Sequence, residues 1–342
     1  MNVRRRLAAS RINTAGTAAL AATALAIGTL SGCSSDSNAA EGEGDGGKLD
    51  VVASFYPMQF LAEQIGGDHV SVTSLTEPGQ EPHDLEISAQ QTAKLQEADA
   101  ILYLKGLQPS VDEAVGQSEV KTKVDAATLT KLEDLGTEDS HGHGEGEEEH
   151  AGEEEHAGEE EHAGEEEEHA LDPHVWLDPV KYAEIAEGVG KALEKQDPDN
   201  AADYKKNTAD LVKKLDDLNT EYEGGLKNTK TKVFFTNHAA FGYLAERYGL
   251  TMEAISGLEP GSEPSAARVK ELQQEAKADG VTTVFYETLV SDKTAKTLAS
   301  DAGLKTDVLD PLEGITDKSK GDDYFQVMQA NLTALEKALG TK

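Results

Sequence analysis

Short apolar runs alternate with amphipathic stretches over most of this 342-residue chain, and this alternation limits the possible folds more than any other feature. Apolar runs bounded by Gly, Pro, Asn and Asp indicate buried strands, and the stretches between them have helical spacing. Strands that alternate with helices form parallel sheets covered by helices. The sequence therefore predicts an α/β protein.

The predicted elements form two groups of similar make-up. In the first group we expect strands at 49–55, 70–75, 100–104 and 121–126, with helices near 57–65, 88–97 and 110–115. In the second group we expect strands at 232–236, 251–255, 283–286 and 306–309, with helices near 240–248, 265–278, 291–302 and 323–339. This arrangement predicts two similar α/β lobes with parallel sheets, at 49–178 and 230–342.

The stretch between the lobes, 179–229, is almost wholly helical in pattern and is broken only around 197–199. Its second part has apolar residues at helical spacing with Lys and Asp between them, which is typical of a long amphipathic helix. These apolar residues are Leu211, Leu215, Leu218 and Tyr222. We expect this helix to join the lobes as a rigid strut beside an interlobe cleft.

The N-terminal segment has the pattern of a targeting sequence. Four arginines within the first eleven residues precede an Ala- and Leu-rich stretch at 14–30 that is too short and too interrupted for a membrane span. It ends in Leu30-Ser31-Gly32-Cys33, which resembles a bacterial lipobox and contains the only cysteine. We predict a lipoprotein signal peptide at 1–32, lipidation of Cys33 and a flexible tether at 33–48. The alternative is an ordinary signal peptide that happens to contain a cysteine.

An acidic repeat interrupts the first lobe at 138–170. It holds 16 of the 65 acidic residues and no Lys or Arg, and Gly-Glu-Glu-Glu-His-Ala recurs within it. Because it has no residues that could form a core, we expect a disordered loop. Its histidines are His141, His143, His150, His156, His162 and His169. They predict an auxiliary, low-affinity metal-binding loop, and a merely solubilising spacer is the alternative.

Charge and cysteine content exclude several classes of partner and site. A formal net charge of −34 opposes binding to nucleic acid, which depends on Lys and Arg neutralising phosphates. A single cysteine cannot form an internal disulfide or a Cys-rich zinc finger. Any metal site in this chain must therefore use His, Asp and Glu.

Three of the four histidines outside the repeat lie where α/β proteins bind ligands. His83 and His238 follow predicted strands, and His174 lies just before the interlobe helices. Ligands bind at the carboxyl edges of parallel strands. Each histidine alone could be a packing or capping residue, but together they favour a shared metal site in the interlobe cleft. His69 is interpreted as a turn residue before a strand.

Four segments resemble the signatures of the zinc/manganese class of ABC-transporter substrate-binding lipoproteins, of the ZnuA type. They are Pro78-Gly-Gln-Glu-Pro-His-Asp, Asp172-Pro-His-Val-Trp-Leu-Asp-Pro, Thr236-Asn-His-Ala-Ala-Phe-Gly-Tyr and Leu309-Asp-Pro-Leu-Glu-Gly. The likeness runs from about residue 49 to the C-terminus. It implies that His83, His174 and His238 are imidazole ligands and that Asp310 supplies the carboxylate that completes the site. It also implies that the lobes make only small motions.

Glu287 follows the predicted strand at 283–286, at the same edge of the second sheet. We expect it to support the ligands from beside them, and direct ligation is the alternative. Three imidazoles and one carboxylate suit tetrahedral Zn²⁺, whereas Mn²⁺ prefers more oxygen ligands and a higher coordination number.

The resemblance therefore implies a zinc-binding protein that is extracytoplasmic and lipid-anchored to the cell membrane. It would be a monomer and not an enzyme, and it would deliver Zn²⁺ to an ABC permease and its ATPase. The alternatives are a surface adhesin lipoprotein, a manganese-binding transport protein, and a zinc hydrolase in which the metal activates water.

Deleting residues 139–170 should spare tight zinc binding and remove several weaker zinc equivalents, because the repeat lacks core-forming residues and holds six histidines. Titration calorimetry with Zn²⁺ on the full and the deleted chain separates the two classes of site. Loss of tight binding on deletion would place the repeat in the primary site and contradict the prediction.

Overall fold

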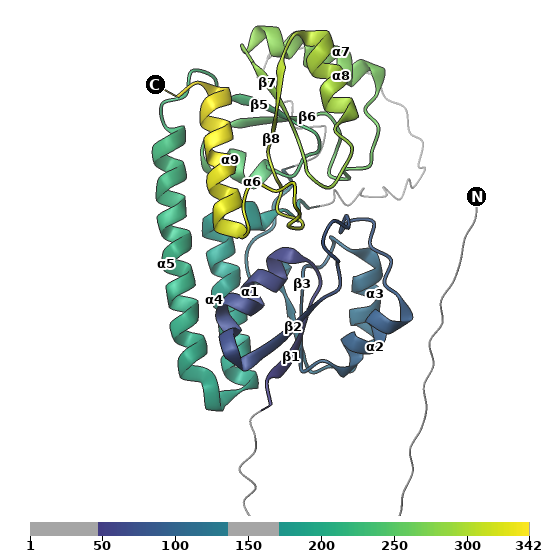
Figure 1. The fold of residues 1–342 in the computed structure, drawn as a ribbon, viewed down its shortest axis with the longest axis vertical. Coiled ribbons are helices and arrows are strands. Elements are labelled where there is room, and N and C mark those ends of the chain that lie inside the picture. The colour runs from purple at the N-terminus through teal and green to yellow at the C-terminus, as the bar shows by residue number, and fades with distance from the viewer. Residues whose placement is uncertain (1–46, 136–170, 342) are drawn as a thin grey trace, which may run out of the picture. The chain divides into compact units, whose positions relative to one another are not determined.

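The computed structural model describes residues 47–135 and 171–341 (Figure 1). The predicted signal peptide, Cys33, all of the tether but its last two residues, and the acidic repeat with its six histidines lie outside the described residues. Within the two described ranges, no helix has both the length and the apolar character needed to cross a membrane.

The first lobe contains a four-stranded parallel sheet with the strand order β2-β1-β3-β4. Its elements are β1 (Leu49–Ala53), α1 (Tyr56–Gly66), β2 (Val70–Ser74), α2 (Ala89–Glu97), β3 (Ala100–Tyr103), α3 (Pro109–Gln117) and β4 (Thr122–Asp125). Alternate residues of β1 face opposite sides of the sheet. Val51 packs in the core with α1, whereas Val52 packs with Leu95 of α2 and Val111 of α3. Both faces of the sheet are therefore covered by helices.

The second lobe repeats this arrangement with the strand order β6-β5-β7-β8. Its elements are β5 (Val233–Thr236), α6 (Gly242–Arg247), β6 (Thr251–Ala254), α7 (Ala266–Ala278), β7 (Thr283–Tyr286), α8 (Lys293–Ala302), β8 (Lys305–Val308) and α9 (Tyr324–Leu339). Phe234 of β5 packs in the core that includes α9, and Phe235 packs with residues of α7 and α8. In each sheet the parallel strands bring their carboxyl ends to one edge.

Two helices, α4 (Pro179–Gln196) and α5 (Ala201–Leu226), lie between the lobes in the sequence. Helix α5 packs against α4 and contacts both α1 of the first lobe and α9 of the second, and Figure 1 shows it running beside both lobes. Asn207 of α5 donates to the Ile65 carbonyl at 3.0 Å, and the Tyr222 hydroxyl donates to the Met328 carbonyl at 2.7 Å. The long helix is therefore bonded to both lobes.

The N-terminus of α4 is tied to the second lobe by Asp178. One of its oxygens accepts from the Val180 N–H at 2.9 Å and so caps the helix. The other oxygen accepts from Nε and from a terminal nitrogen of Arg247 in α6, at 2.8 and 2.6 Å. Asp178 is 1% exposed and the Arg247 side chain is 34% exposed, so this pair is a partly buried link between α4 and the second lobe.

The predicted fold is confirmed: two parallel α/β lobes are joined by a long helix. The predicted strands and helices all form, and the helical stretch breaks at Pro198–Asn200, close to the expected position. Three short 3₁₀ helices of the described ranges were not predicted: Gly67–His69, Ala126–Thr128 and, directly after His174, Val175–Leu177. The residues of Val175–Leu177 are fully buried, so no polar alternation marks that helix in the sequence.

The close approach of α4 and α5 depends on Gly190. A Cβ added there would lie 2.2 Å from Thr208 Oγ1, whereas one added at Gly224 of α5 would have no atom within 4 Å. Gly190→Ala should therefore destabilise the protein by about 1–3 kcal/mol through overpacking. Gly224→Ala should stabilise it by about 0.4–1 kcal/mol, because Ala favours the helix and restricts the unfolded chain. Urea unfolding of both variants measures the difference, and equal effects would contradict the packing argument.

Candidate metal centre

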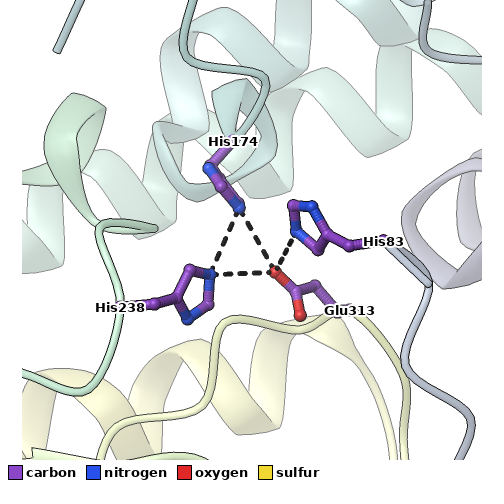
Figure 2. A group of neighbouring side chains, drawn as sticks. All are labelled: His83, His174, His238 and Glu313. Atoms are coloured by element: carbon purple, nitrogen blue, oxygen red, sulfur yellow. Dashed lines mark hydrogen bonds and ion pairs between the residues drawn. The ribbon is translucent and has the colours of Figure 1, made fainter. Parts of the chain in front are cut away.

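Four side chains from separate parts of the sequence meet at one buried point (Figure 2). His83 comes from the loop after β2, and His238 follows β5 by two residues. His174 directly precedes the 3₁₀ helix Val175–Leu177, and Glu313 lies in the loop between β8 and α9. The three histidines predicted from the sequence are therefore brought together.

Four of the six distances between the facing atoms of this cluster are nearly equal. Glu313 Oε1 lies 3.3 Å from His83 Nε2, 3.3 Å from His174 Nε2 and 3.4 Å from His238 Nε2. His174 Nε2 and His238 Nε2 are 3.4 Å apart. A regular tetrahedron with such edges has its centre about 2.0–2.1 Å from each corner, which is the distance at which zinc binds imidazole nitrogen. These four of the six edges thus have the length found in a tetrahedral zinc shell, and all ligand atoms of the cluster lie within 4.8 Å of one another.

All four residues are buried: His174, His238 and Glu313 are 0% exposed and His83 is 8% exposed. Among the described residues they form the one group of His, Cys, Asp or Glu side chains whose ligand atoms lie within 4.8 Å of one another. Glu313 Oε2 is buried with no hydrogen-bond partner. A buried, charged carboxylate is unfavourable unless positive charge lies close to it. The cluster is therefore suited to a buried cation.

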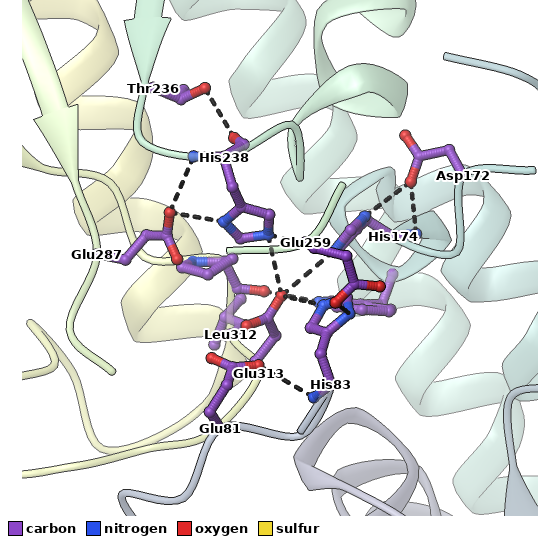
Figure 3. A network of polar contacts seen from close by, with 12 residues as sticks. Glu81, His83, Asp172, His174, Thr236, His238, Glu259, Glu287, Leu312 and Glu313 are labelled. Carbon is purple, nitrogen blue, oxygen red and sulfur yellow. Dashed lines mark hydrogen bonds and ion pairs between the residues drawn. The ribbon is translucent and has the colours of Figure 1, made fainter. Parts of the chain in front are cut away.

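Two carboxylates orient two of the imidazoles (Figure 3). Asp172 Oδ1 lies 2.8 Å from His174 Nδ1 and also accepts from the His174 backbone N–H at 2.8 Å. Glu287 Oε1 lies 2.6 Å from His238 Nδ1. A carboxylate at Nδ1 keeps the proton on that nitrogen and directs the lone pair of Nε2 toward the centre. The structure thus places Glu287 beside His238 and outside the ligand cluster.

His83 is held differently, through its backbone. Its N–H donates to Glu81 Oε1 at 3.1 Å, and its Nδ1 is 3.8 Å from Glu259 Oε2, on a side chain that is 66% exposed. Burial and the neighbouring carboxylate of Glu313 raise the pKa of Glu81 to about 8. His83 is therefore the imidazole nearest to solvent and the one without a close carboxylate at Nδ1.

The fourth member of the cluster differs from the sequence prediction, which chose Asp310. Asp310 lies outside the cluster, since Oδ1 accepts from the Leu312 N–H at 2.9 Å and Oδ2 from the Thr288 hydroxyl at 3.3 Å. Leu312 has a positive φ of 59°, and this turn brings Glu313 toward the imidazoles instead. Both acids belong to Leu309-Asp-Pro-Leu-Glu-Gly, so the motif pointed to the loop that enters the cluster, but the carboxylate in the cluster is that of Glu313.

Opposite effects of burial and charge act on the cluster. Burial alone would lower the pKa of His238, but the carboxylates of Glu287 and Glu313 outweigh it and hold that pKa well above its ordinary value. Burial alone would raise the pKa of Glu313, but bonds to the surrounding imidazoles, His174 foremost, hold that pKa well below its ordinary value. Burial also opposes the charged form of His174, whose pKa Asp172 and Glu313 nevertheless raise. Protons and a metal cation therefore compete for the same nitrogens.

Residues 51–338 match the ZnuA family, described as "Zinc-uptake complex component A periplasmic". The chain belongs to this family. The high-affinity zinc uptake system protein ZnuA of Bacillus subtilis is 38% identical over 319 residues, covering 92% of this chain and 94% of that protein. The zinc-binding lipoprotein AdcA of Streptococcus pneumoniae is 38% identical over 297 residues, or 85% of this chain. This chain covers 56% of that AdcA, little more than half of its length.

A solved structure shares the fold of this ZnuA-family chain. It is the crystal structure of the Zn(II)-bound ZnuA-like domain of Streptococcus pneumoniae AdcA, with a TM-score of 0.67 and 35% sequence identity. The match covers 86% of this chain and 99% of that domain. The two-lobed arrangement is therefore that of a known zinc-bound relative.

In the metal-free ZnuA-family protein, the cluster should stabilise the fold most between about pH 4.3 and pH 6.5, the ordinary pKa values of Glu and His. The contribution of His238 is fully present below its unfolded pKa and is lost as pH rises through its raised folded pKa. The contribution of Glu313 is present above its unfolded pKa and is lost as pH falls through its lowered folded pKa.

Urea unfolding with a chelator present, repeated across pH, measures this window. As pH rises, the Glu287→Gln variant should begin to lose stability at a lower pH than the wild-type protein, because the amide no longer stabilises the charged form of His238. Identical profiles for the two proteins above pH 6.5 would contradict this assignment.

Proposed function

We propose that this chain is the extracytoplasmic zinc-binding component of an ABC-type zinc importer, with His83, His174, His238 and Glu313 as the ligands of the transported ion. The spacing of the four ligand atoms carries the proposal, because edges of 3.3–3.4 Å fit a tetrahedral ion at zinc–imidazole distance. Membership of a family of zinc-uptake components supports the same function. Zinc is here the cargo of the protein and not the cofactor of a reaction.

The donor set favours zinc over manganese. Three imidazole nitrogens and one carboxylate oxygen are typical zinc ligands, whereas Mn²⁺ prefers mostly oxygen donors in a higher coordination number. The carboxylates of Asp172 and Glu287 strengthen this preference, because a hydrogen-bonded imidazole is a better and better-oriented donor. The manganese-binding alternative is therefore less well supported.

The proposed ligands come from both lobes, which suits a protein that captures an ion and then delivers it. His83 and His174 belong to the proposed N-terminal lobe, and His238 and Glu313 belong to the proposed C-terminal lobe. An ion bound by all four stabilises the contact between the lobes. Because α5 is bonded to both lobes, we expect release to need only small local motions. The permease and its ATPase would receive the ion from the cleft.

The N-terminal pattern supports attachment to the outer face of the cell membrane. Lipidation of Cys33, after removal of a signal peptide at 1–32, would anchor the chain through the tether at 33–48. One relative is itself called a zinc-binding lipoprotein. In this scheme the histidines of the acidic repeat at 138–170 bind zinc weakly.

The family is one of uptake components and not of enzymes. The chemistry of the site agrees, since a zinc hydrolase keeps an open coordination position for water. Here Glu313 occupies the fourth position beside the three imidazoles. We do not propose the surface-adhesin alternative.

His83→Ala, His174→Ala and His238→Ala should each lower zinc affinity by at least about tenfold, because each removes one of four ligands and leaves an incomplete shell. Glu313→Gln should act in the same direction. His69→Ala is the matched control, since His69 pairs with Asp203 at 2.9 Å and lies outside the cluster. Competition with a chromophoric chelator measures the dissociation constants. Unchanged constants in the three histidine variants would refute the proposed site.

A further inference from the structure

We infer that Asp310 is a positioning residue, which holds the turn that brings Glu313 to the three imidazoles. By fixing that turn, Asp310 also determines that the cation receives one oxygen of Glu313 and not two. The inference rests on the proposed function, because it concerns how the same site holds zinc. It gives Asp310 a role that is not ligation.

Every polar group of Asp310 is used to fix its own position. The residue is 2% exposed. Its backbone N–H donates to Asn331 Oδ1 at 2.9 Å, and its carbonyl accepts from Asn331 Nδ2 at 2.7 Å. Its carboxylate accepts from the Thr288 hydroxyl and from the Leu312 N–H. Asp310 is thus anchored to α9 and to the end of β7, and it extends this anchoring to Leu312.

Leu312 is where the chain turns. Its φ of 59° lies in the left-handed region, and no other non-glycine residue in the described ranges has a positive φ. L-residues with a side chain avoid this region unless their surroundings enforce it. The Leu312 side chain is fully buried in the main core, and its N–H is held by Asp310 Oδ1. Packing on one side and the Asp310 carboxylate on the other therefore enforce the turn.

Pro311, between Asp310 and Leu312, is held by a bond from the segment that carries His174. Trp176 Nε1 donates to the Pro311 carbonyl at 2.7 Å, and the Tyr324 hydroxyl donates to the Trp176 carbonyl at 2.7 Å. Trp176 follows His174 by two residues. The segments that carry Glu313 and His174 are therefore linked by direct bonds, and each residue from 310 to 313 has a fixed partner.

The turn at Leu312 places the two carboxylate oxygens of Glu313 in different surroundings. Oε1 lies 3.3–3.4 Å from all three Nε2 atoms, whereas Oε2 is buried without a hydrogen-bond partner. With the turn loosened, the carboxylate can move so that both oxygens reach the ion, and the coordination number rises from four to five. Higher coordination numbers suit Mn²⁺ better than Zn²⁺. Asp310 therefore favours zinc without touching it.

The test compares Asp310→Ala with Asp310→Asn in the otherwise unchanged chain. The asparagine can still accept from the Leu312 N–H, and its amide can donate to the Thr288 hydroxyl, so it preserves the turn but abolishes the charge. We expect Asp310→Ala to lower zinc affinity by about 10–100-fold and to reduce the preference for Zn²⁺ over Mn²⁺. Asp310→Asn should stay within about threefold of the wild-type affinity, because only the turn matters in this inference.

Loading the site with Co²⁺ in place of Zn²⁺ gives an absorption spectrum that a general loss of stability would not change. Tetrahedral Co²⁺ absorbs more strongly in the visible range than five- or six-coordinate Co²⁺. The Co²⁺-loaded Asp310→Ala protein should lose intensity per bound ion, and the Asp310→Asn protein should keep it.

Two further variants keep the test decisive. Thr288→Val removes only the bond to Asp310 Oδ2 and should give a smaller change in the same direction, which is measurable even if Asp310→Ala does not fold. Asp307→Ala is the matched control. Asp307 lies three residues earlier, on β8, and its carboxylate pairs with Lys320 and Lys337 at 2.8 Å each. It should leave zinc affinity and the cobalt spectrum unchanged.

The outcomes separate this inference from the proposed function. Equal losses in Asp310→Ala and Asp310→Asn would make Asp310 a ligand and overturn the inference. Wild-type affinity in Asp310→Ala, or lower affinity with an unchanged cobalt spectrum, would also overturn it. Failure of the wild-type chain to bind zinc would instead refute the proposed function.

Discussion

The structure depends on placing four polar ligand atoms together in a space closed to solvent. A buried carboxylate and three buried imidazoles are unfavourable unless each has a partner, and in this protein their partners are one another. Two more carboxylates surround the cluster. Those of Asp172 and Glu287 bond Nδ1 of His174 and His238, on the side of each ring that faces away from the centre. His174 and His238 are thereby each fixed in one tautomer and one orientation. The site is organised before an ion arrives.

The topology makes such a meeting possible. Both lobes have the same strand order, so each presents the loops that follow its strands at one edge. His238 and Glu287 follow β5 and β7, the neighbouring strands at which the chain changes its direction of winding across the second sheet, where α/β folds bind ligands. The Asp178–Arg247 pair and the hydrogen bonds of α5 to α1 and α9 hold the two lobes in a fixed arrangement. A small change in either lobe would alter several ligand distances at once.

Sequence reasoning found the parts of the molecule that local patterns determine. Apolar runs and helical spacing identified the strands and the long helix, because burial and periodicity act within a few residues. The histidines could be grouped because few occur outside the acidic repeat. The choice between Asp310 and Glu313 was beyond such reasoning. It depends on the conformation of Leu312, which is set by Thr288, Asn331 and Trp176 from distant segments. The role of Asp172 likewise became visible only with its distance to His174.

Trp176 is the only tryptophan in the chain, and its surroundings have a practical consequence. Its ring centroid lies 5.2 Å from that of His174 and 4.9 Å from that of Phe55, and its indole nitrogen bonds the turn that bears Glu313. Indole emission responds to nearby charge and to hydrogen bonding at its nitrogen. The tryptophan emission of this protein therefore comes from a single reporter in contact with two of the four proposed ligand segments. Events at the cleft can be followed optically in the native chain, without attaching a dye.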